Sequence, residues 1–380
     1  MPFPGVNVNV GNGNLLRQIA VLDAVPALMV TVNTAALVAA LLEVYSLADA
    51  ESKGITAEAE PFAHKLLEEY YNELGGKQRL FFFGTDASMT MAEALTASEA
   101  NGVSKLLRLG LGEINLVAIA RKPAANYNPG TAFLDADVAA AVTACKSMAE
   151  AMQCANTPVR SLIEGRVADA GKPNSYKPNE ATNGFAGVVL GDTANDGSAA
   201  VSLALARACK YGAHIKLGSG ENGALSASQI YIGTDKLEDR VDMETLHDAG
   251  FITFMHRPGS AGYFFGVDNM CSKDDFHILA HGRVIDKVQR IAVEAYQPYV
   301  ETGIRMEQDG SINATEAADI EATLKTTILA AMSEQISQVD VNVPIDQDVI
   351  NSSSLSVEVK VMPLGYLSWI TVNLGLAANL

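Results

Sequence analysis

Three residues of the kinds that bind transition metals lie close together along the chain. Cys271 precedes His277 and His281, and the two histidines are four residues apart, so a helix would place them on one face. Two imidazoles placed in this way can share one cation such as Zn²⁺. Asp274, Asp275, Arg283 and Asp286 surround them, however, which is more typical of a solvated helix face with partly buried histidines. We therefore predict no metal site.

The glycine-rich segment 218–223 is the next candidate, because its spacing matches G-x-G-x-x-G. It lacks the Gly-Lys-Ser/Thr ending of a phosphate loop, and the residues that follow predict a turn into a strand rather than a helix that would bind phosphate. No G-x-S-x-G motif and no local cysteine–histidine signature is present. We predict no catalytic residue and no cofactor, and keep as the alternative a cytosolic α/β enzyme with a ligand pocket near Gly218–Gly223.

Composition narrows the class of protein. The chain has 380 residues and a formal net charge of −17, which disfavours nucleic acid as a partner because phosphate binding needs a basic face. The sequence has no run of the ~18 apolar residues that a membrane helix needs, and no secretory signal is recognisable at its start. Four widely spaced cysteines without a C-x-x-C motif favour reduced thiols in a cytoplasm.

Short apolar runs alternate with helical patterns over most of the chain, which predicts an α/β fold whose sheet is parallel in its centre and mixed overall, with flanking helices. Strands are expected at 25–32, 80–84, 114–120, 159–164, 185–190, 251–255 and 262–267, and helices at 58–74, 90–109, 135–154, 198–211, 242–249 and 274–300. A further helix is expected at 314–338, where apolar residues recur every four positions from Ile320 to Ile336 and acidic residues predominate.

Both ends of the chain alternate apolar and polar residues at period two, which is typical of strands. The first ten residues form one such stretch, and residues 354–374 form two, separated by Pro363 and Gly365. A lone hairpin is marginally stable in water, so these strands need partners. They either close a sheet within the chain, which is the commoner case, or are donated to neighbouring chains.

The segment 250–303 resembles contractile tail sheath proteins of phages and related injection particles. It contains Gly-Tyr-Phe-Phe-Gly at 262–266, a short polar loop and a long helix with the pattern R-x-x-D-K-x-x-R at 283–290. The opening Pro4-Gly5-Val6 and the alternating C-terminal strands are also similar to sheaths. The chain is too short for the large outer domains that many sheaths carry, so its outer surface is expected to be compact.

The resemblance implies a structural subunit that polymerises as stacked rings or a helix around an inner tail tube and contracts. Its partners would be other copies of itself, the tube protein, and baseplate and tail terminator proteins, in a particle assembled in the bacterial cytoplasm. The implied organisation is an N-terminal β-arm at 1–20, a first α/β region at 21–157, a sheath core at 158–348, and a C-terminal β-arm at 349–380. The arms would be exchanged between subunits.

The resemblance also implies roles for particular residues. The apolar residues of the inter-subunit arms would be Val6, Val8, Val10, Leu355, Val357, Val359, Val361, Ile370 and Val372. Arg283, Asp286, Lys287 and Arg290 are three or four residues apart and would form one charged stripe that contacts other subunits, with a merely solvated face as the alternative. Glu316, Asp319 and Glu321 would face the tube or a neighbouring subunit, unless the acidic surplus serves only solubility.

Overall fold

A six-stranded sheet forms the centre of the larger part of the chain in this computed structural model, which describes residues 22–96, 98–368 and 370–372. The strand order is β2-β3-β1-β4-β5-β6; neighbours are parallel except for the edge strand β2, which runs antiparallel to β3. The strands are β1 (Pro26–Thr31), β2 (Leu41–Val44), β3 (Leu80–Thr85), β4 (Leu116–Ala120), β5 (Arg160–Glu164) and β6 (Ala186–Val189). The prediction of a mixed α/β sheet, parallel in its centre, is confirmed.

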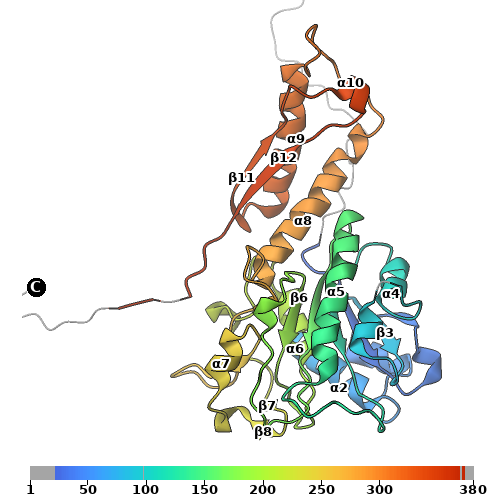
Figure 1. Ribbon diagram of the computed structural model, residues 1–380, viewed down its shortest axis with the longest axis vertical. Coiled ribbons are helices and arrows are strands. Elements are labelled where there is room, and N and C mark those ends of the chain that lie inside the picture. Colours follow the sequence, from blue (N-terminus) through green and yellow to red (C-terminus); the bar gives the residue numbers. More distant parts are fainter. Residues whose placement is uncertain (1–21, 97, 369, 373–380) are drawn as a thin grey trace, which may run out of the picture.

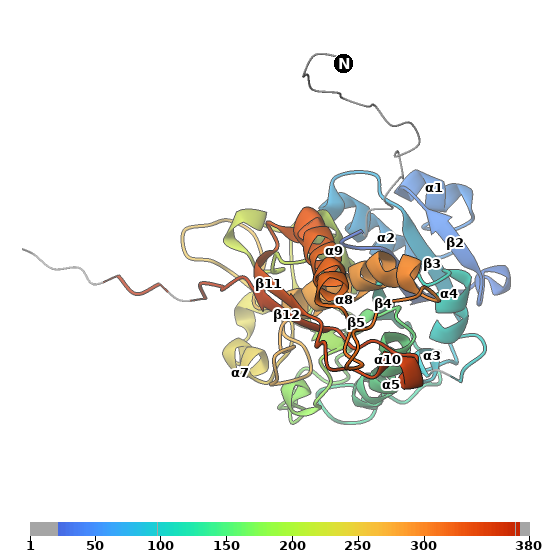
Figure 2. The same ribbon diagram turned by 90° about the horizontal axis from the view of Figure 1, so that it is seen from above.

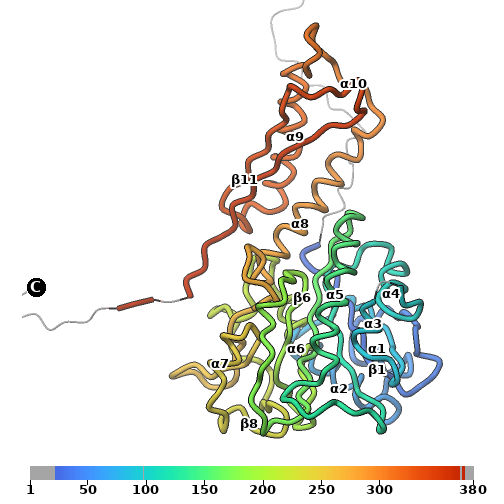
Figure 3. The backbone as a smooth tube through the Cα atoms, in the orientation of Figure 1, coloured from blue at the N-terminus to red at the C-terminus, as the bar shows by residue number. Residues whose placement is uncertain are grey.

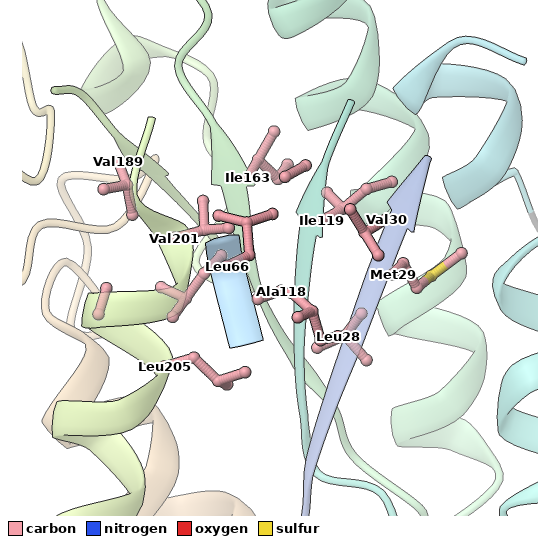
Figure 4. Packing of buried hydrophobic residues seen from close by; sticks show 14 of the residues in the cluster. Leu28, Met29, Val30, Leu66, Ala118, Ile119, Ile163, Val189, Val201 and Leu205 are labelled. Atoms are coloured by element: carbon pink, nitrogen blue, oxygen red, sulfur yellow. The ribbon is translucent and has the colours of Figure 1, made fainter. Parts of the chain in front are cut away.

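Two groups of helices cover this sheet. The first, α2 (Pro61–Leu74) and α6 (Val201–Lys210), packs on the central strands, and the second consists of α5 (Ala136–Cys154) with α3 (Met91–Leu95) and α4 (Val103–Leu109) beside it. Every residue of the five parallel strands is buried, as expected for a sheet covered on both faces. Figure 4 shows Leu66 of α2 and Val201 and Leu205 of α6 among the apolar residues that pack on the strands.

The helix predicted at 90–109 is two helices. Thr90 and Glu93 form a capping box that starts α3. The break falls at Gly102, where an added Cβ would lie 2.5 Å from the carbonyl oxygen of Ala94. Only glycine permits this close approach, and α4 begins directly after it at Val103.

The remaining elements of this part are short. Small hairpins and turns follow the sheet, and the segment around Ile252 makes a parallel bridge to β6 at Val189. These elements are α1 (Leu47–Ser52), α7 (Met243–Asp248), β7 (Tyr231–Ile232), β8 (Asp235–Lys236), β9 (Phe254–Met255), β10 (Phe264–Phe265) and the 3₁₀ helices η1 (Ala35–Leu37), η2 (Pro178–Glu180), η3 (Gly220–Asn222) and η4 (Leu237–Asp239). A further 3₁₀ helix, η5 (Gln297–Tyr299), belongs to the C-terminal unit.

A smaller C-terminal unit stands above the α/β body (Figures 1 and 3). It consists of α8 (Leu279–Tyr296), α9 (Ala314–Met332), β11 (Ile336–Asn342), α10 (Val349–Ser352) and β12 (Glu358–Pro363). β11 and β12 form an antiparallel pair that packs on α8 and α9. The unit has apolar clusters of its own, separate from the main core, and α8 contributes residues to both the main core and the unit. Figure 2 shows the unit from above.

Three predicted boundaries are corrected. The helix predicted at 314–338 ends at Met332, and a strand that the sequence analysis missed begins at Ile336. The division predicted at 157/158 falls between β4 and β5, which are hydrogen-bonded neighbours in one sheet, so the two predicted regions form one body. The C-terminal arm predicted at 349–380 contains β12, which pairs with β11 of the same chain. Its first strand is therefore closed within the chain.

Because β12 belongs to the chain's own sheet, truncation after Asn351 should destabilise the C-terminal unit. It would uncover Val339 and Val341 and remove the half-buried Val357, Val359 and Val361, each worth about 1 kcal/mol at half burial. Hydrogen exchange should accelerate in β11 and α9 and stay slow in the central sheet. Truncation after Ser368, which keeps β12, is the matched control. It should change neither the stability of the C-terminal unit nor the exchange rates in β11 and α9. Slow exchange of β11 in the shorter chain would contradict this assignment.

Candidate functional site: an ionic junction and an open sheet

A buried ion pair joins the body to the C-terminal unit. Arg160, the first residue of β5, is 1% exposed, and its Nε and Nη2 donate to the two carboxylate oxygens of Asp286 on α8 at 2.7 and 2.8 Å. Its Nη1 donates to the carbonyl of Gly184 at 2.6 Å. The guanidinium also lies over the rings of Phe185 and Phe276, at 4.7 and 5.3 Å from their centroids. This two-pronged geometry is the strongest form of an arginine–carboxylate contact.

A glycine on α8 makes room for this pair. A Cβ added at Gly282 would lie 2.6 Å from Cζ of Arg160, so any other residue there would displace either the guanidinium from Asp286 or α8 from β5. The carbonyl of Gly282 accepts a further hydrogen bond from Nη2 of Arg160 at 3.4 Å. The helix therefore approaches the sheet at a position where a side chain is absent.

One turn apart on α8, Arg283 and Lys287 bind the body at two places, the end of α6 and the segment that enters β1. Arg283 Nη2 donates to the carbonyl of Ala208 at 2.7 Å, and Lys287 Nζ donates to Oδ1 of Asp23 at 2.7 Å. Burial acts to raise the pKa of Asp23, but the hydrogen bond and charge of Lys287, with a hydrogen bond from Gln335 and the charge of Arg283, together lower this pKa. Burial lowers the pKa of Arg283. Both side chains thus have partners within the chain.

Arg290, one turn further on, binds three backbone carbonyls at the amino edge of the sheet. Its Nη1 donates to Gly112 at 2.7 Å, and its Nη2 donates to Ile114 and Pro158 at 3.0 Å each. Carbonyls that precede β4 and β5 would otherwise need water or another donor. Arg290 therefore fixes the amino ends of two strands to α8.

The interpretation of these charges as a surface stripe is corrected. Arg283, Asp286 and Lys287 are buried, Arg290 is half-buried, and their polar partners lie in the same chain. These four residues therefore form neither a solvated helix face nor a charged face that is free to contact another subunit. Arg160, the buried partner of Asp286, was not singled out from the sequence. The one available signal was an arginine near the start of a predicted strand.

The β11–β12 pair is the feature most suited to binding another chain. Within the described residues these two strands pair only with each other, so each has an edge without a strand partner. Side chains alternate across the pair: Val339 and Val341 are buried against the helices, while Gln338, Asp340 and Asn342 face outward. On β12, Val359 and Val361 are only half-buried. The apolar face of this sheet is therefore incompletely covered along β12.

The predicted arm residues fall into three groups. Val6, Val8 and Val10 lie outside the described residues. Val357, Val359 and Val361 pack on the C-terminal unit of their own chain, and Leu355 lies nearby and is exposed. Beyond β12 the chain extends away from the rest of the molecule (Figure 1), and there Ile370 and Val372 are 76% and 69% exposed.

Of the three acidic residues predicted to face a tube, two have structural partners. Glu316 accepts a hydrogen bond from the backbone N–H of Arg305, and Glu321 accepts one from the N–H of Val343, at 2.7 Å each. Asp319 lies on the same helix and its side chain is exposed. Only Asp319 presents a carboxylate that is free of such a backbone contact to the outer side of α9.

The candidate metal residues do not form a site. Nδ1 of His277 and of His281 lies 2.8 and 3.1 Å from the carbonyls of Asp274 and Asp275, and Cys271 is buried in the main core, where burial raises the pKa of its thiol. Within the described residues, no three or more His, Cys, Asp or Glu side chains are grouped so that they could hold a metal ion.

The glycine-rich segment 218–223 is a turn that surrounds an arginine. The guanidinium of Arg207 pairs with Glu73 and donates to the carbonyls of Asn222 and Gly223 at 2.8 and 3.1 Å. A phosphate loop would instead direct backbone N–H groups toward its ligand. This contact, together with the short 3₁₀ turn at Gly220–Asn222, does not favour a ligand pocket here.

The fold is that of contractile sheath proteins. A chain in the structure of the contracted helical sheath of the anti-feeding prophage (AFP) is 15% identical, with a TM-score of 0.64 and 99% of each chain covered. A chain in the contracted PVC sheath complex, an extracellular contractile injection system, is 11% identical, with a TM-score of 0.63 and coverage of 100% of this chain and 98% of the other. A chain in the AFP baseplate structure is 14% identical, with a TM-score of 0.62 and 99% of each chain covered.

Sequence comparison adds a match at the C-terminal end. Residues 275–380 match a family described as DUF2586, C-terminal domain, and this range begins four residues before α8. A search of the curated proteins found no match. The predicted resemblance to tail sheath proteins is confirmed at the level of the fold, and it extends over the whole chain. None of the described helices is long and apolar enough to span a bilayer.

Replacing Asp286 with alanine should destabilise the chain strongly, because it leaves Arg160 buried without its carboxylate. We expect a loss of ~3–5 kcal/mol in the free energy of unfolding, measured with urea. Glu294→Ala, an exposed position on the same helix, is the control and should change stability by less than ~0.5 kcal/mol. An Asp286→Ala chain as stable as the parent would mean that Arg160 finds another partner and that the junction does not depend on this pair.

Proposed function

We propose that the chain is the structural subunit of a contractile tail sheath, in a phage tail or a related injection particle. It would polymerise as stacked rings or a helix around an inner tube and shorten to drive that tube through a target envelope. Its function would be architectural rather than catalytic. The likeness to chains in contracted sheath structures supports this proposal through the fold, and the features below support it through the chemistry of assembly.

One observation carries the proposal: the chain has both an incomplete sheet and, beyond β12, an exposed apolar segment that could add a strand to such a sheet. Val359 and Val361 of β12 are half-buried beside an edge without a strand partner among the described residues. Ile370 and Val372 are two residues apart, so an extended segment places both on one face. Their apolar side chains match the face that β12 leaves partly uncovered.

Donation of this segment to a neighbouring chain follows from simple geometry. An added strand gains main-chain hydrogen bonds along the free edge, and its alternate side chains determine the register. The donating and accepting surfaces differ, so the contact is heterologous and the assembly can grow without closing. The N-terminal stretch with Val6, Val8 and Val10 is proposed to act in the same way on another neighbour.

The outer side of α9 is proposed to contact the inner tube or an adjacent subunit, mainly through Asp319. A single exposed ion pair contributes only ~0.2–1 kcal/mol. Many such contacts repeated along a tube hold it firmly, yet each can break when the sheath contracts.

Contraction would draw on free energy stored in the extended lattice, so no nucleotide is needed. Baseplate and tail terminator proteins would contact the two ends of the polymer, and assembly would take place in the bacterial cytoplasm.

Electron microscopy of the purified protein tests the proposal as a whole. Tubes or rings are expected, and their formation should depend on protein concentration. A small particle that stays monomeric at every concentration would favour the alternative of a cytosolic α/β enzyme instead.

Placing charge on the donated face should abolish assembly. We expect the double substitution Ile370→Asp and Val372→Asp to eliminate sedimenting polymer, because two carboxylates would have to be buried against β12 of the next chain. Thr371→Asp, on the opposite face of the same segment, is the matched control and should still polymerise. The free energy of unfolding should be unchanged in both variants, since these residues are exposed in the single chain. Normal polymers from the double variant would exclude donation of this segment.

Charge reversal on α9 tests the proposed tube contact. Asp319→Lys should reduce co-sedimentation with the inner tube several-fold while sheath-only polymers persist, and the loss should be greatest at low salt, where the Debye length is ~10 Å or more. Glu150→Lys, an exposed acidic residue on α5, makes the same change of net charge away from α9 and should have no effect. Equal binding by both variants would assign the contact to another surface.

A further inference from the structure

Among the described residues that follow β12, one aromatic side chain, Tyr366, makes a hydrogen bond and ring contacts with the rest of the molecule. Gly365, Leu367 and Ser368 are exposed, and Leu367 is 85% exposed, whereas Tyr366 between them is half-buried. The described residues after Ser368, 370–372, are all exposed. Tyr366 is thus the last side chain of the described segment that is even partly buried.

Tyr366 makes contacts with the body and with α8 at the same time. Its hydroxyl donates to the backbone carbonyl of His214, in the loop that follows α6. Nζ of Lys216, in the same loop, lies 5.3 Å from the centroid of the tyrosine ring, within the range of a cation–π contact. The ring of His281, near the start of α8, lies 5.6 Å away, centroid to centroid, at an angle of 33°. Burial raises the pKa of Tyr366 to about 12, which keeps the hydroxyl protonated and able to donate.

The chain between β12 and Tyr366 crosses a groove. A cavity of about 500 Å³ lies here, and its lining includes Lys216, His277 and His281 together with the residues from Met362 to Tyr366. An added side chain at Gly365 would meet no atom within 4 Å. The connection is therefore loosely packed at Gly365, and Leu364 before it is only half-buried. The hydrogen bond and ring contacts of Tyr366 are thus the specific contacts that can determine where the segment leaves the molecule.

We propose that Tyr366 is a positioning residue. It fixes the point at which the segment of residues 364–372 leaves the molecule, so that Ile370 and Val372 point in one direction and are available to another chain. Without this contact, residues 364–372 would turn freely about the end of β12 at Pro363. The segment could then also fold back onto the open edge of its own sheet, because only a few residues separate the two. Holding Tyr366 at His214 and His281 directs the segment away from its own β12 and toward another chain. This inference rests on the proposed donation of the segment.

The single tryptophan of the chain, Trp369, provides a direct measurement of this attachment. Its fluorescence anisotropy reports motion of the segment three residues beyond Tyr366, and it is measured below the assembly concentration, where the chain is unassembled. Tyr366→Ala should lower this anisotropy. Tyr366→Phe, which keeps the ring but loses the hydrogen bond to His214, should lower it less. Ser368→Ala, an exposed neighbour, is the control and should leave it unchanged.

Assembly provides the second measurement. The concentration needed for polymerisation should rise about tenfold in Tyr366→Ala, which corresponds to about 1.4 kcal/mol and is within the entropic cost of fixing the backbone of one residue. Its melting temperature should stay within a few degrees of the parent. Unchanged anisotropy in Tyr366→Ala, or lowered anisotropy with unchanged assembly, would overturn the positioning role. A large fall in melting temperature would also overturn it and assign Tyr366 to folding.

The two proposals can fail separately. Anisotropy is measured on the unassembled chain, so it does not depend on strand donation. If the double substitution at Ile370 and Val372 leaves polymers intact, donation fails whatever the anisotropy of Tyr366→Ala. If that double substitution abolishes polymers while Tyr366→Ala changes neither anisotropy nor assembly, donation stands and only the positioning role is lost.

Discussion

The contact between Arg160 and Asp286 is the constraint on which the arrangement of the two units depends. A buried charge pair tolerates little displacement, since either charge left alone in the interior is strongly unfavourable. Both carboxylate oxygens of Asp286 accept hydrogen bonds from Arg160, and the guanidinium lies over the rings of two phenylalanines. Gly282 lets α8 approach β5 closely. α8 therefore has one position on the body. Because it also carries the core of the C-terminal unit, the open sheet has one position as well.

Much of the body was predictable because its elements rely on local patterns. Apolar runs identified the parallel strands, the apolar face of α2 identified that helix, and an alanine-rich composition identified α5, both to within a few residues. β11 was missed for a physical reason. The four-residue spacing of apolar positions from Ile320 to Met332 continues to Ile336, which extends a helical pattern into a strand. What makes residues 336–342 a strand is pairing with β12, about twenty residues away, and pairing at that distance is not visible in a local window.

The contacts of the candidate site were even less predictable, because they join residues that are far apart in the sequence. The spacing of Arg283, Asp286, Lys287 and Arg290 is identical whether a helix face is solvated or buried against partners. The deciding partner of Asp286 is 126 residues earlier in the chain, and that of Lys287 is 264 residues earlier. Similarly, alternation at the C-terminus predicted strands, but not that the first would pair with β11 of the same chain while Ile370 and Val372 stay exposed. The anchor at Tyr366 had no sequence signal, because a backbone carbonyl, a lysine and a histidine from two distant segments create it.

The alternation on β11 and β12 has a consequence for spacing. Polar residues such as Asp340 and Lys360, which are directly opposite each other, occupy the outer face, and valines occupy the inner face. A strand that slides along this sheet by one residue turns its apolar side chains outward, whereas a slide of two residues restores the match. Any strand bound here is thus restricted to positions roughly 7 Å apart, since each residue advances a strand by about 3.3 Å. The distance between linked molecules would then change in discrete steps rather than continuously.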